Sequence, residues 1–241
     1  MSIVKSYSFP NGNNRGDMFY IQHNSKNFTI IDCFLKEGNT PDCRKDEIIS
    51  ELYEMSEHRI RRFISTHPDN DHICGLDILD DSLKICNFYA VENQRTVDNS
   101  NPSFVRYCEL KERYNFEIYA KRERAYLNKD GMLKNGRKIG SAGLSFLWPF
   151  RHDVAFKKAL ENVNAGLDGA CVNNISPIII YTIKNGPVFM WMGDMLSDMQ
   201  EEFLSYYRKH GRIIPHVDIL FHPHHGRKTA QIPDKIGRAH V

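Results

Sequence analysis

The sequence lacks the features that mark several special classes of protein. Its six cysteines form no CxxC pair, and no apolar run is long enough to span a membrane. The formal charge is only +2, from 32 basic and 30 acidic residues, so overall charge neither requires nor excludes a polyanionic partner. The opening stretch, MSIVKSYSFPNGNN, has no apolar targeting core. These absences predict a cytoplasmic protein with reduced thiols and no membrane anchor.

The length and composition of the chain favour a single globular domain. An apolar content of 41% over 241 residues is enough to bury a large core. We expect one domain over residues 1–234. Residues 235–241, KIGRAHV, look like the translation of a common sequencing adapter. We therefore expect this heptapeptide to be an artefact and the domain to be truncated at its C-terminus.

Apolar segments of strand length alternate with segments of helical periodicity. Two strands are expected over residues 18–21 and 28–33, joined as a hairpin by the turn HNSKN. A helix over residues 46–62 and a short helix over residues 73–79 flank the strand RRFIST, and KICNFYAV is the next strand. Later strands are expected over residues 145–150, 178–183, 188–192 and 217–221, with a helix over residues 197–210. This order predicts the α/β class.

The stretch STHPDNDHICG places two histidines and two carboxylates within six residues, directly after an expected strand. A turn opened by Pro68 would let alternate side chains of this short loop face one point, where they could bind a cation. The side chains concerned are His67, Asp69, Asp71 and His72. An ordinary acidic loop with capping aspartates is the alternative, but a solvated loop rarely needs two imidazoles. The pattern therefore indicates a metal site.

Two further polar groups follow expected strands. Asp194 comes directly after VFMWMG, and His224 and His225 follow the strand over residues 217–221. Each signal is weak alone, because an aspartate after a strand is most often a cap. Together with the first cluster they place three sets of metal-ligand side chains at the carboxyl ends of strands, where α/β folds place their sites.

These motifs resemble those of the metallo-β-lactamase-fold hydrolases. The order HPDNDH, NNIS, GD and HHG is most similar to the ComEC-like competence hydrolase domain, whose pattern is His-x-Asp-x-Asp-His, Asn-Asn-x-Ser, Gly-Asp and His-His-Gly. Gly16-Asp17 and Asp32 also match, so the resemblance covers residues 16–226. It implies an αββα four-layer sandwich. Arg227 departs from the family, which usually has serine there.

The resemblance also implies a role for each site residue. One metal would be held by His67 and Asp69 and a second by Asp71 and His72, with Asp194 bridging them. The implied metal ligands are His67, Asp69, Asp71, His72, Asp194 and His225, with His224 as the alternative to His225. The implied catalytic residues are Asp71, Asp32 and His224, of which Asp32 would orient a ligand histidine. The implied substrate-binding residues are Asn174, Ser176, Arg227 and Lys228. His152 is interpreted as a loop residue.

We expect one or two divalent metal ions, zinc or manganese, and carboxylate-rich ligation shifts the preference from zinc toward harder ions such as manganese. The implied activity is that of a phosphodiesterase or nuclease that uses a metal-activated hydroxide. Residues 106–140 contain ten basic and five acidic residues with interleaved tyrosines, a composition typical of single-stranded nucleic acid binding. A solvated helix face with core tyrosines explains the same composition. Hydrolysis of a small ester or lactone and a metal-free binding module remain as alternatives.

Overall fold

The computed structural model of the protein describes residues 2–9, 16–23, 27–36, 44–95, 100–114, 116–120 and 141–232. The chain divides into two compact units. Unit 1 comprises residues 1–90 and 97–117, and unit 2 comprises residues 91–96 and 118–241. The single domain over residues 1–234 stays a prediction. The expected artefact, residues 235–241, lies outside the described residues.

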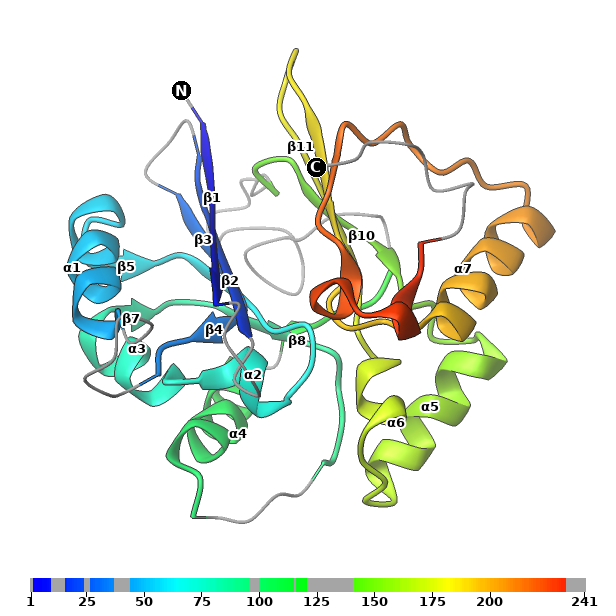
Figure 1. The fold of residues 1–241 in the computed structure, drawn as a ribbon, viewed down its shortest axis with the longest axis horizontal. Helices are drawn as coiled ribbons and strands as arrows, with labels where there is room; N and C mark the ends of the chain where they lie inside the picture. Colours follow the sequence, from blue (N-terminus) through cyan, green and yellow to red (C-terminus); the bar gives the residue numbers. More distant parts are fainter. Residues whose placement is uncertain are drawn as a thin grey trace, which may run out of the picture. The chain divides into compact units, whose positions relative to one another are not determined.

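Unit 1 contains a six-stranded sheet in the order β1-β2-β3-β6-β8-β9 (Figure 1). Its strands are β1 (Ile3–Phe9), β2 (Gly16–Gln22), β3 (Phe28–Ile31), β6 (Arg62–Ile64), β8 (Phe88–Ala90) and β9 (Phe116–Glu117). The first three strands pair antiparallel, which confirms the expected β2–β3 hairpin, and the other neighbours pair parallel. The short strands β5 (Arg59–Ile60) and β7 (Lys84–Ile85) pair with each other, and β4 (Cys33–Phe34) directly follows Asp32.

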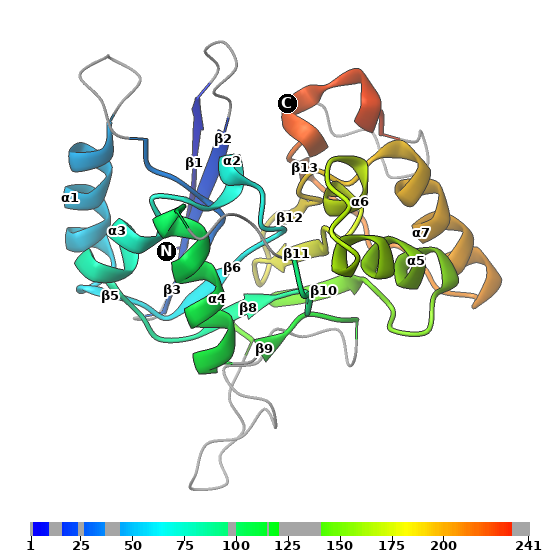
Figure 2. The ribbon, with the colours of Figure 1, turned by 90° about the horizontal axis from the view of Figure 1, so that it is seen from below.

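The described residues of unit 1 form four helices: α1 (Lys45–Met55), α2 (Asn70–Ile73), α3 (Leu76–Ser82) and α4 (Pro102–Tyr114). Helices α1, α3 and α4 pack on the six-stranded sheet, as Figure 2 shows. The spacing of Ile48 and Leu52 places both on one side of α1, where they are buried in the core. Tyr107 of α4 is buried in the same core. This packing holds β6 in place, and the end of β6 leads into the segment with His67, Asp69, Asp71 and His72.

The helix expected over residues 46–62 is shorter than predicted. Helix α1 ends at Met55, and Glu57 and His58 have φ values of 51° and 65°. A left-handed backbone at two successive residues cannot continue a right-handed helix. The chain therefore turns and enters β5 at Arg59.

Unit 2 contains a four-stranded sheet in the order β10-β11-β12-β13. The strands are β10 (Leu144–Trp148), β11 (Ile178–Thr182), β12 (Val188–Trp191) and β13 (Ile219–Leu220). The helices are α5 (Val154–Asn164), α6 (Ala170–Asn173) and α7 (Ser197–Lys209). Trp148 is fully buried and makes edge contacts with Phe156 of α5 and Phe203 of α7. Both helices thus pack on this sheet through one aromatic core.

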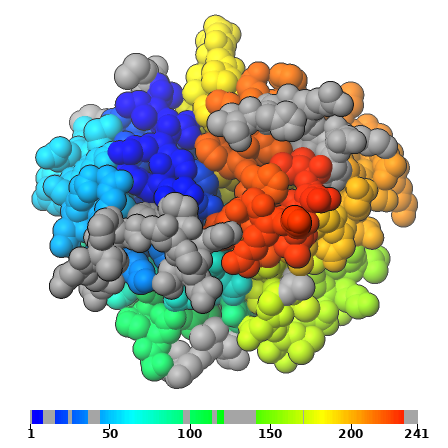
Figure 3. Space-filling model, viewed as in Figure 1, coloured from blue at the N-terminus to red at the C-terminus, as the bar shows by residue number. Residues whose placement is uncertain are grey.

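The chain ends, within the described residues, in the two short 3-10 helices η1 (Pro223–Gly226) and η2 (Lys228–Ala230). Atoms of this segment, drawn in red, are visible on the surface of unit 2 in Figure 3. The predicted α/β class is confirmed, because each unit combines a sheet with helices packed on it. The four-layer αββα arrangement stays an implication of the resemblance. None of the helices in the described ranges has the length and apolar character that a membrane crossing requires.

Candidate metal centre

The unit 1 ligand loop, residues 67–72, follows β6 and includes most of the short helix α2. It carries His67, Asp69, Asp71 and His72. Strand β4 pairs with the residues just after the loop through bridges from Cys33 to Ile73 and from Phe34 to Cys74. A Cβ added to Gly16 of β2 would lie 2.8 Å from the Asp71 carbonyl oxygen, closer than side chains come. Glycine is therefore needed for the close approach of β2 to this loop.

Asp32 is the buried centre of the hydrogen bonds that hold the loop. Its carboxylate accepts from the Thr66 amide at 2.7 Å and the Thr66 hydroxyl at 2.6 Å, and lies 2.8 Å from Nδ1 of His72. The residue is 2% exposed, and its φ of 57° is a left-handed conformation that is costly for aspartate. Because an ionised carboxylate only accepts, Nδ1 of His72 donates the proton, and Nε2 is the nitrogen with the lone pair that a metal needs.

The second histidine of the loop is oriented in the same way. The Thr66 hydroxyl donates a hydrogen bond to Asp32. Its oxygen can therefore accept a hydrogen bond from Nδ1 of His67, which lies 3.0 Å away. Nε2 of His67 lies 3.7 Å from the Asp69 carboxylate, and the rings of His67 and His72 lie 4.1 Å apart. Two buried imidazoles are thus anchored at Nδ1, His72 by Asp32 and His67 by Thr66, and both present Nε2 as the ligand atom.

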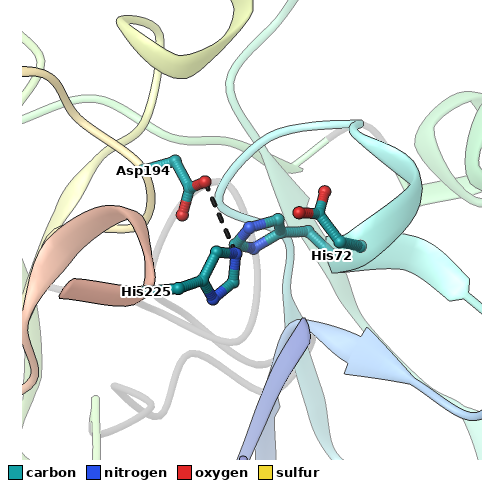
Figure 4. A group of neighbouring side chains, drawn as sticks. His72, Asp194 and His225 are labelled. Atoms are coloured by element: carbon teal, nitrogen blue, oxygen red, sulfur yellow. Dashed lines mark ion pairs between the residues drawn. The ribbon is translucent and has the colours of Figure 1, made fainter. Parts of the chain in front are cut away.

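In unit 2, Asp194 lies in the loop between β12 and α7 and is 3% exposed. Its carboxylate lies 3.6 Å from Nε2 of His225, the ion pair drawn in Figure 4, and 3.7 Å from Nε2 of His224. Both histidines have left-handed backbones, with φ values of 50° and 52°. Left-handed backbone at two successive non-glycine residues is costly, so the surrounding contacts must hold it in place.

Hydrogen bonds distinguish the two histidines of η1. Nη1 of Arg227 lies 3.1 Å from Nε2 of His224, and because arginine only donates, this nitrogen must be the acceptor. Nδ1 of His224 then carries the proton and donates to the Thr229 hydroxyl at 2.9 Å. The lone pair on Nε2 of His224 therefore accepts the hydrogen bond from Arg227. This favours His225 as the metal ligand.

Asn174 and Ser176 hold the loop that carries Asp194. The Ser176 hydroxyl accepts from the Asp194 amide at 3.2 Å, and Oδ1 of Asn174 accepts from the Leu196 amide at 3.1 Å. Nδ2 of Asn174 donates to the Asp198 carboxylate at 3.2 Å. Ser176 is fully buried and Asn174 is nearly so, whereas Arg227 and Lys228 are exposed.

The donor atoms fit a divalent metal ion. Asp71 and His72 of unit 1 each offer one ligand atom, and Asp194 and His225 of unit 2 do the same. Imidazole nitrogens and carboxylate oxygens are common ligands of divalent metal ions in proteins. The sequence did not reveal the residues whose hydrogen bonds support the candidate ligands or their loops. These residues are Thr66, Thr229, Asp198 and Gln200. Only Thr66 lies inside a recognisable motif.

The described part of the basic segment comprises residues 106–114 and 116–120, and its part in α4 packs within unit 1. Arg106 lies 2.8 Å from both Asp80 and Asp81, and Arg113 lies 3.7 Å from Asp80. Residues 121–140 lie outside the described residues. In unit 2, His152 is exposed in the turn before α5, consistent with its interpretation as a loop residue.

Neither a protein-family model nor a curated protein sequence matches the chain. Among solved structures, a B3 metallo-β-lactamase with an active-site glutamic acid is 13% identical, with 94% of this chain and 78% of that chain covered and a TM-score of 0.42. A β-lactamase domain protein from Burkholderia ambifaria is 11% identical, with 98% and 69% covered and a TM-score of 0.49. A candidate metallo-β-lactamase from Thermotoga maritima is 13% identical, with 91% and 94% covered and a TM-score of 0.45. Likeness at this level says nothing about the substrate.

Proposed function

We propose that the protein is a metal-dependent hydrolase that cleaves phosphodiester bonds. The proposal is carried by one observation, the pair of buried histidines whose Nδ1 atoms are anchored through Thr66 and Asp32. Metal-binding histidines commonly donate their second ring nitrogen to a carboxylate or a similar acceptor, which fixes the tautomer and the ring orientation. A merely structural pair of histidines would not need both rings to present the same nitrogen.

In this proposal His67 and Asp69 hold one divalent ion and Asp71 and His72 hold a second. The resemblance implies that Asp194 and His225 complete the ligand set. A bound divalent ion supplies Lewis-acid polarisation and lowers the pKa of water, so that hydroxide is available near neutral pH. Asp32 keeps His72 in the tautomer that can bind a metal through Nε2. Arg227 instead donates a hydrogen bond to Nε2 of His224.

A phosphodiester is favoured over a small ester or lactone by the ComEC-like motifs and by a basic surface of unit 2. No acidic residue lies between residues 203 and 217, and Arg208, Lys209 and Arg212 are exposed there. The Arg212 guanidinium lies 4.7 Å from the ring of Phe150. Exposed basic side chains suit the phosphate backbone of single-stranded nucleic acid.

The test is to measure divalent-metal binding by calorimetry and hydrolysis of single-stranded DNA, a generic phosphodiester and a lactone, each with manganese and with zinc. We expect tight metal binding and cleavage of the phosphodiesters. Cleavage of the lactone alone would show that the substrate class is wrong. Absence of both metal binding and hydrolysis would overturn the proposal.

Asp71→Asn sharpens this test, because it removes a ligand charge while keeping the side-chain size. Turnover should fall by about 10²-fold or more, the scale on which electrostatic groups act in catalysis. His152→Ala is the matched control, since His152 is exposed in unit 2 and should leave turnover within a few-fold. A fully active Asp71→Asn protein would contradict the assigned role.

A further inference from the structure

The Asp194 loop, residues 193–196, has a different hydrogen-bond anchor at each of its four residues. The Gly193 carbonyl accepts from the His224 amide at 3.0 Å, and the Asp194 amide donates to Ser176. The Met195 carbonyl accepts from Nε2 of Gln200 at 2.9 Å. The last anchor is the bond from the Leu196 amide to Asn174. The backbone that positions Asp194 is therefore held from several elements of unit 2.

Asn174 makes the most specific of these contacts. Its side-chain oxygen accepts from the Leu196 amide, and its side-chain NH₂ group faces both carboxylate oxygens of Asp198 at 3.2 Å. An amide can accept from an N–H group on one side and donate to a carboxylate on the other, whereas an ionised carboxylate at the same position could only accept. Asn174 thereby joins the end of the Asp194 loop to the first turn of α7.

We propose that Asn174 is a positioning residue that holds the Asp194 carboxylate in its metal-binding orientation by clamping the Asp194 loop to Asp198. This inference rests on the proposed function and gives Asn174 a role in place of the expected substrate contact. The polar atoms of its amide bond to the protein, and the residue is 7% exposed. Ser176 and Gln200 assist the clamp from fully buried positions.

Satisfying buried backbone groups would explain hydrogen bonds of this kind in any loop. The positioning role makes a further demand, because it requires that loss of the clamp changes the site at Asp194 and not only the stability of unit 2. The Asp194 carboxylate lies within 3.7 Å of two histidines on left-handed backbone, so a small shift of the loop changes these distances directly.

The experiment uses Asn174→Asp, Asp198→Asn and the double variant in the full chain. Asn174→Asp places two carboxylates against each other and should weaken manganese binding by tenfold or more in calorimetry. Asp198→Asn leaves an amide at both position 174 and position 198, so each side chain can still donate and accept. This variant should change manganese binding only a few-fold. The double variant exchanges the amide and the carboxylate, and it should restore binding to within a few-fold of wild type. Glu201→Gln, an exposed change in α7, controls for the lost charge.

Amide hydrogen exchange without added metal gives a second measurement. Residues 194–196 should exchange faster in Asn174→Asp and at the wild-type rate in the double variant, while the last turn of α7 is unchanged. If the wild-type protein and Asn174→Asp bind manganese with equal affinity, the positioning role of Asn174 is wrong and the proposed function still stands. A wild-type protein that binds neither manganese nor zinc would overturn both.

Discussion

In unit 1 the ligand loop is anchored by a buried carboxylate, whereas in unit 2 the Asp194 loop is anchored by amides and a hydroxyl. In unit 1 the single carboxylate of Asp32 accepts three hydrogen bonds. In unit 2 the anchors are divided among Asn174, Ser176 and Gln200. Hydrogen bonds to a charged group are about twice as strong as neutral ones. One loop thus depends on a single charge, and the other on several weaker contacts.

The same contrast extends beyond the loops. Unit 1 joins α4 to α3 through Arg106 and Asp80, and joins β1 to α1 through Lys5 and Glu51. Unit 2 packs aromatic rings around Trp148, although it also pairs Arg95 with Asp168, and unit 1 also stacks Phe63 on Phe88. Ion pairs respond to pH and salt, whereas stacked rings and amides respond little. The comparison teaches that changes of charge should affect unit 1 more than unit 2.

The largest effect should come from Asp32→Asn. The asparagine side chain has nearly the same size, but its NH₂ group would face Nδ1 of His72 and favour the tautomer that carries the proton on Nε2. That tautomer cannot bind a metal through Nε2. Manganese or zinc affinity, measured by calorimetry, should fall about 10- to 100-fold, the usual cost of losing such an orienting partner.

Asp80→Asn is the matched control for Asp32→Asn, since Asp80 is also a buried carboxylate of unit 1 that accepts hydrogen bonds. It should lower the free energy of unfolding but leave metal affinity within a few-fold. Equal loss of metal affinity in both variants would show that general destabilisation, and not the tautomer of His72, sets the effect.

A smaller effect is expected from Ser176→Ala in unit 2. The change leaves the Asp194 amide without its hydroxyl partner, at a cost of about 1–3 kcal/mol for a buried donor. Asn174 and Gln200 still hold the loop, so metal affinity should fall by about tenfold or less, equivalent to ~1.4 kcal/mol. Ser205→Ala, on the exposed side of α7, should change neither property. A loss as large as that of Asp32→Asn would contradict the idea of shared anchors.

The parts of the site that the sequence predicts are those that follow apolar strands. The run before Asp194 is apolar, and the runs before His67 and His224 contain apolar residues at strand length, so their ends and the polar residues after them are visible without a structure. The expected helix over residues 46–62 was too long because nothing in Glu57-His58 signals a left-handed turn. Glycine or asparagine would have given that signal.

The supporting contacts could not be predicted for a different reason. Asn174 and Asp198 are 24 residues apart, and their contact depends on how α7 packs beside the turn that follows α6. Asp32 and Thr66 are 34 residues apart and meet because β3 pairs parallel with β6. Spacing within one motif carries no information about such pairs, since tertiary packing alone brings them together.

The smallest effect should be the acid sensitivity of the contact between β1 and α1 in unit 1. Nζ of Lys5 lies 2.5 and 2.6 Å from the two carboxylate oxygens of Glu51, and the Tyr20 hydroxyl donates to one of them at 3.0 Å. Burial raises the pKa of Glu51, but these hydrogen bonds outweigh it, so the net pKa lies below the ordinary value of 4.5. The contact therefore stabilises the fold above that value and is lost as the pH falls through the lowered pKa.

Glu51→Gln tests this contact, because the glutamine side chain keeps the hydrogen-bonding shape but has no charge to titrate. Urea unfolding at about pH 7 should show a loss of less than about 1 kcal/mol, since the pair is partly exposed. Below about pH 4 the difference from wild type should shrink, because protonation removes the same charge from wild-type Glu51. Glu54→Gln, exposed on the same helix, should show no such convergence. A difference that stays constant from neutral to acid pH would mean that packing, and not charge, holds β1 against α1.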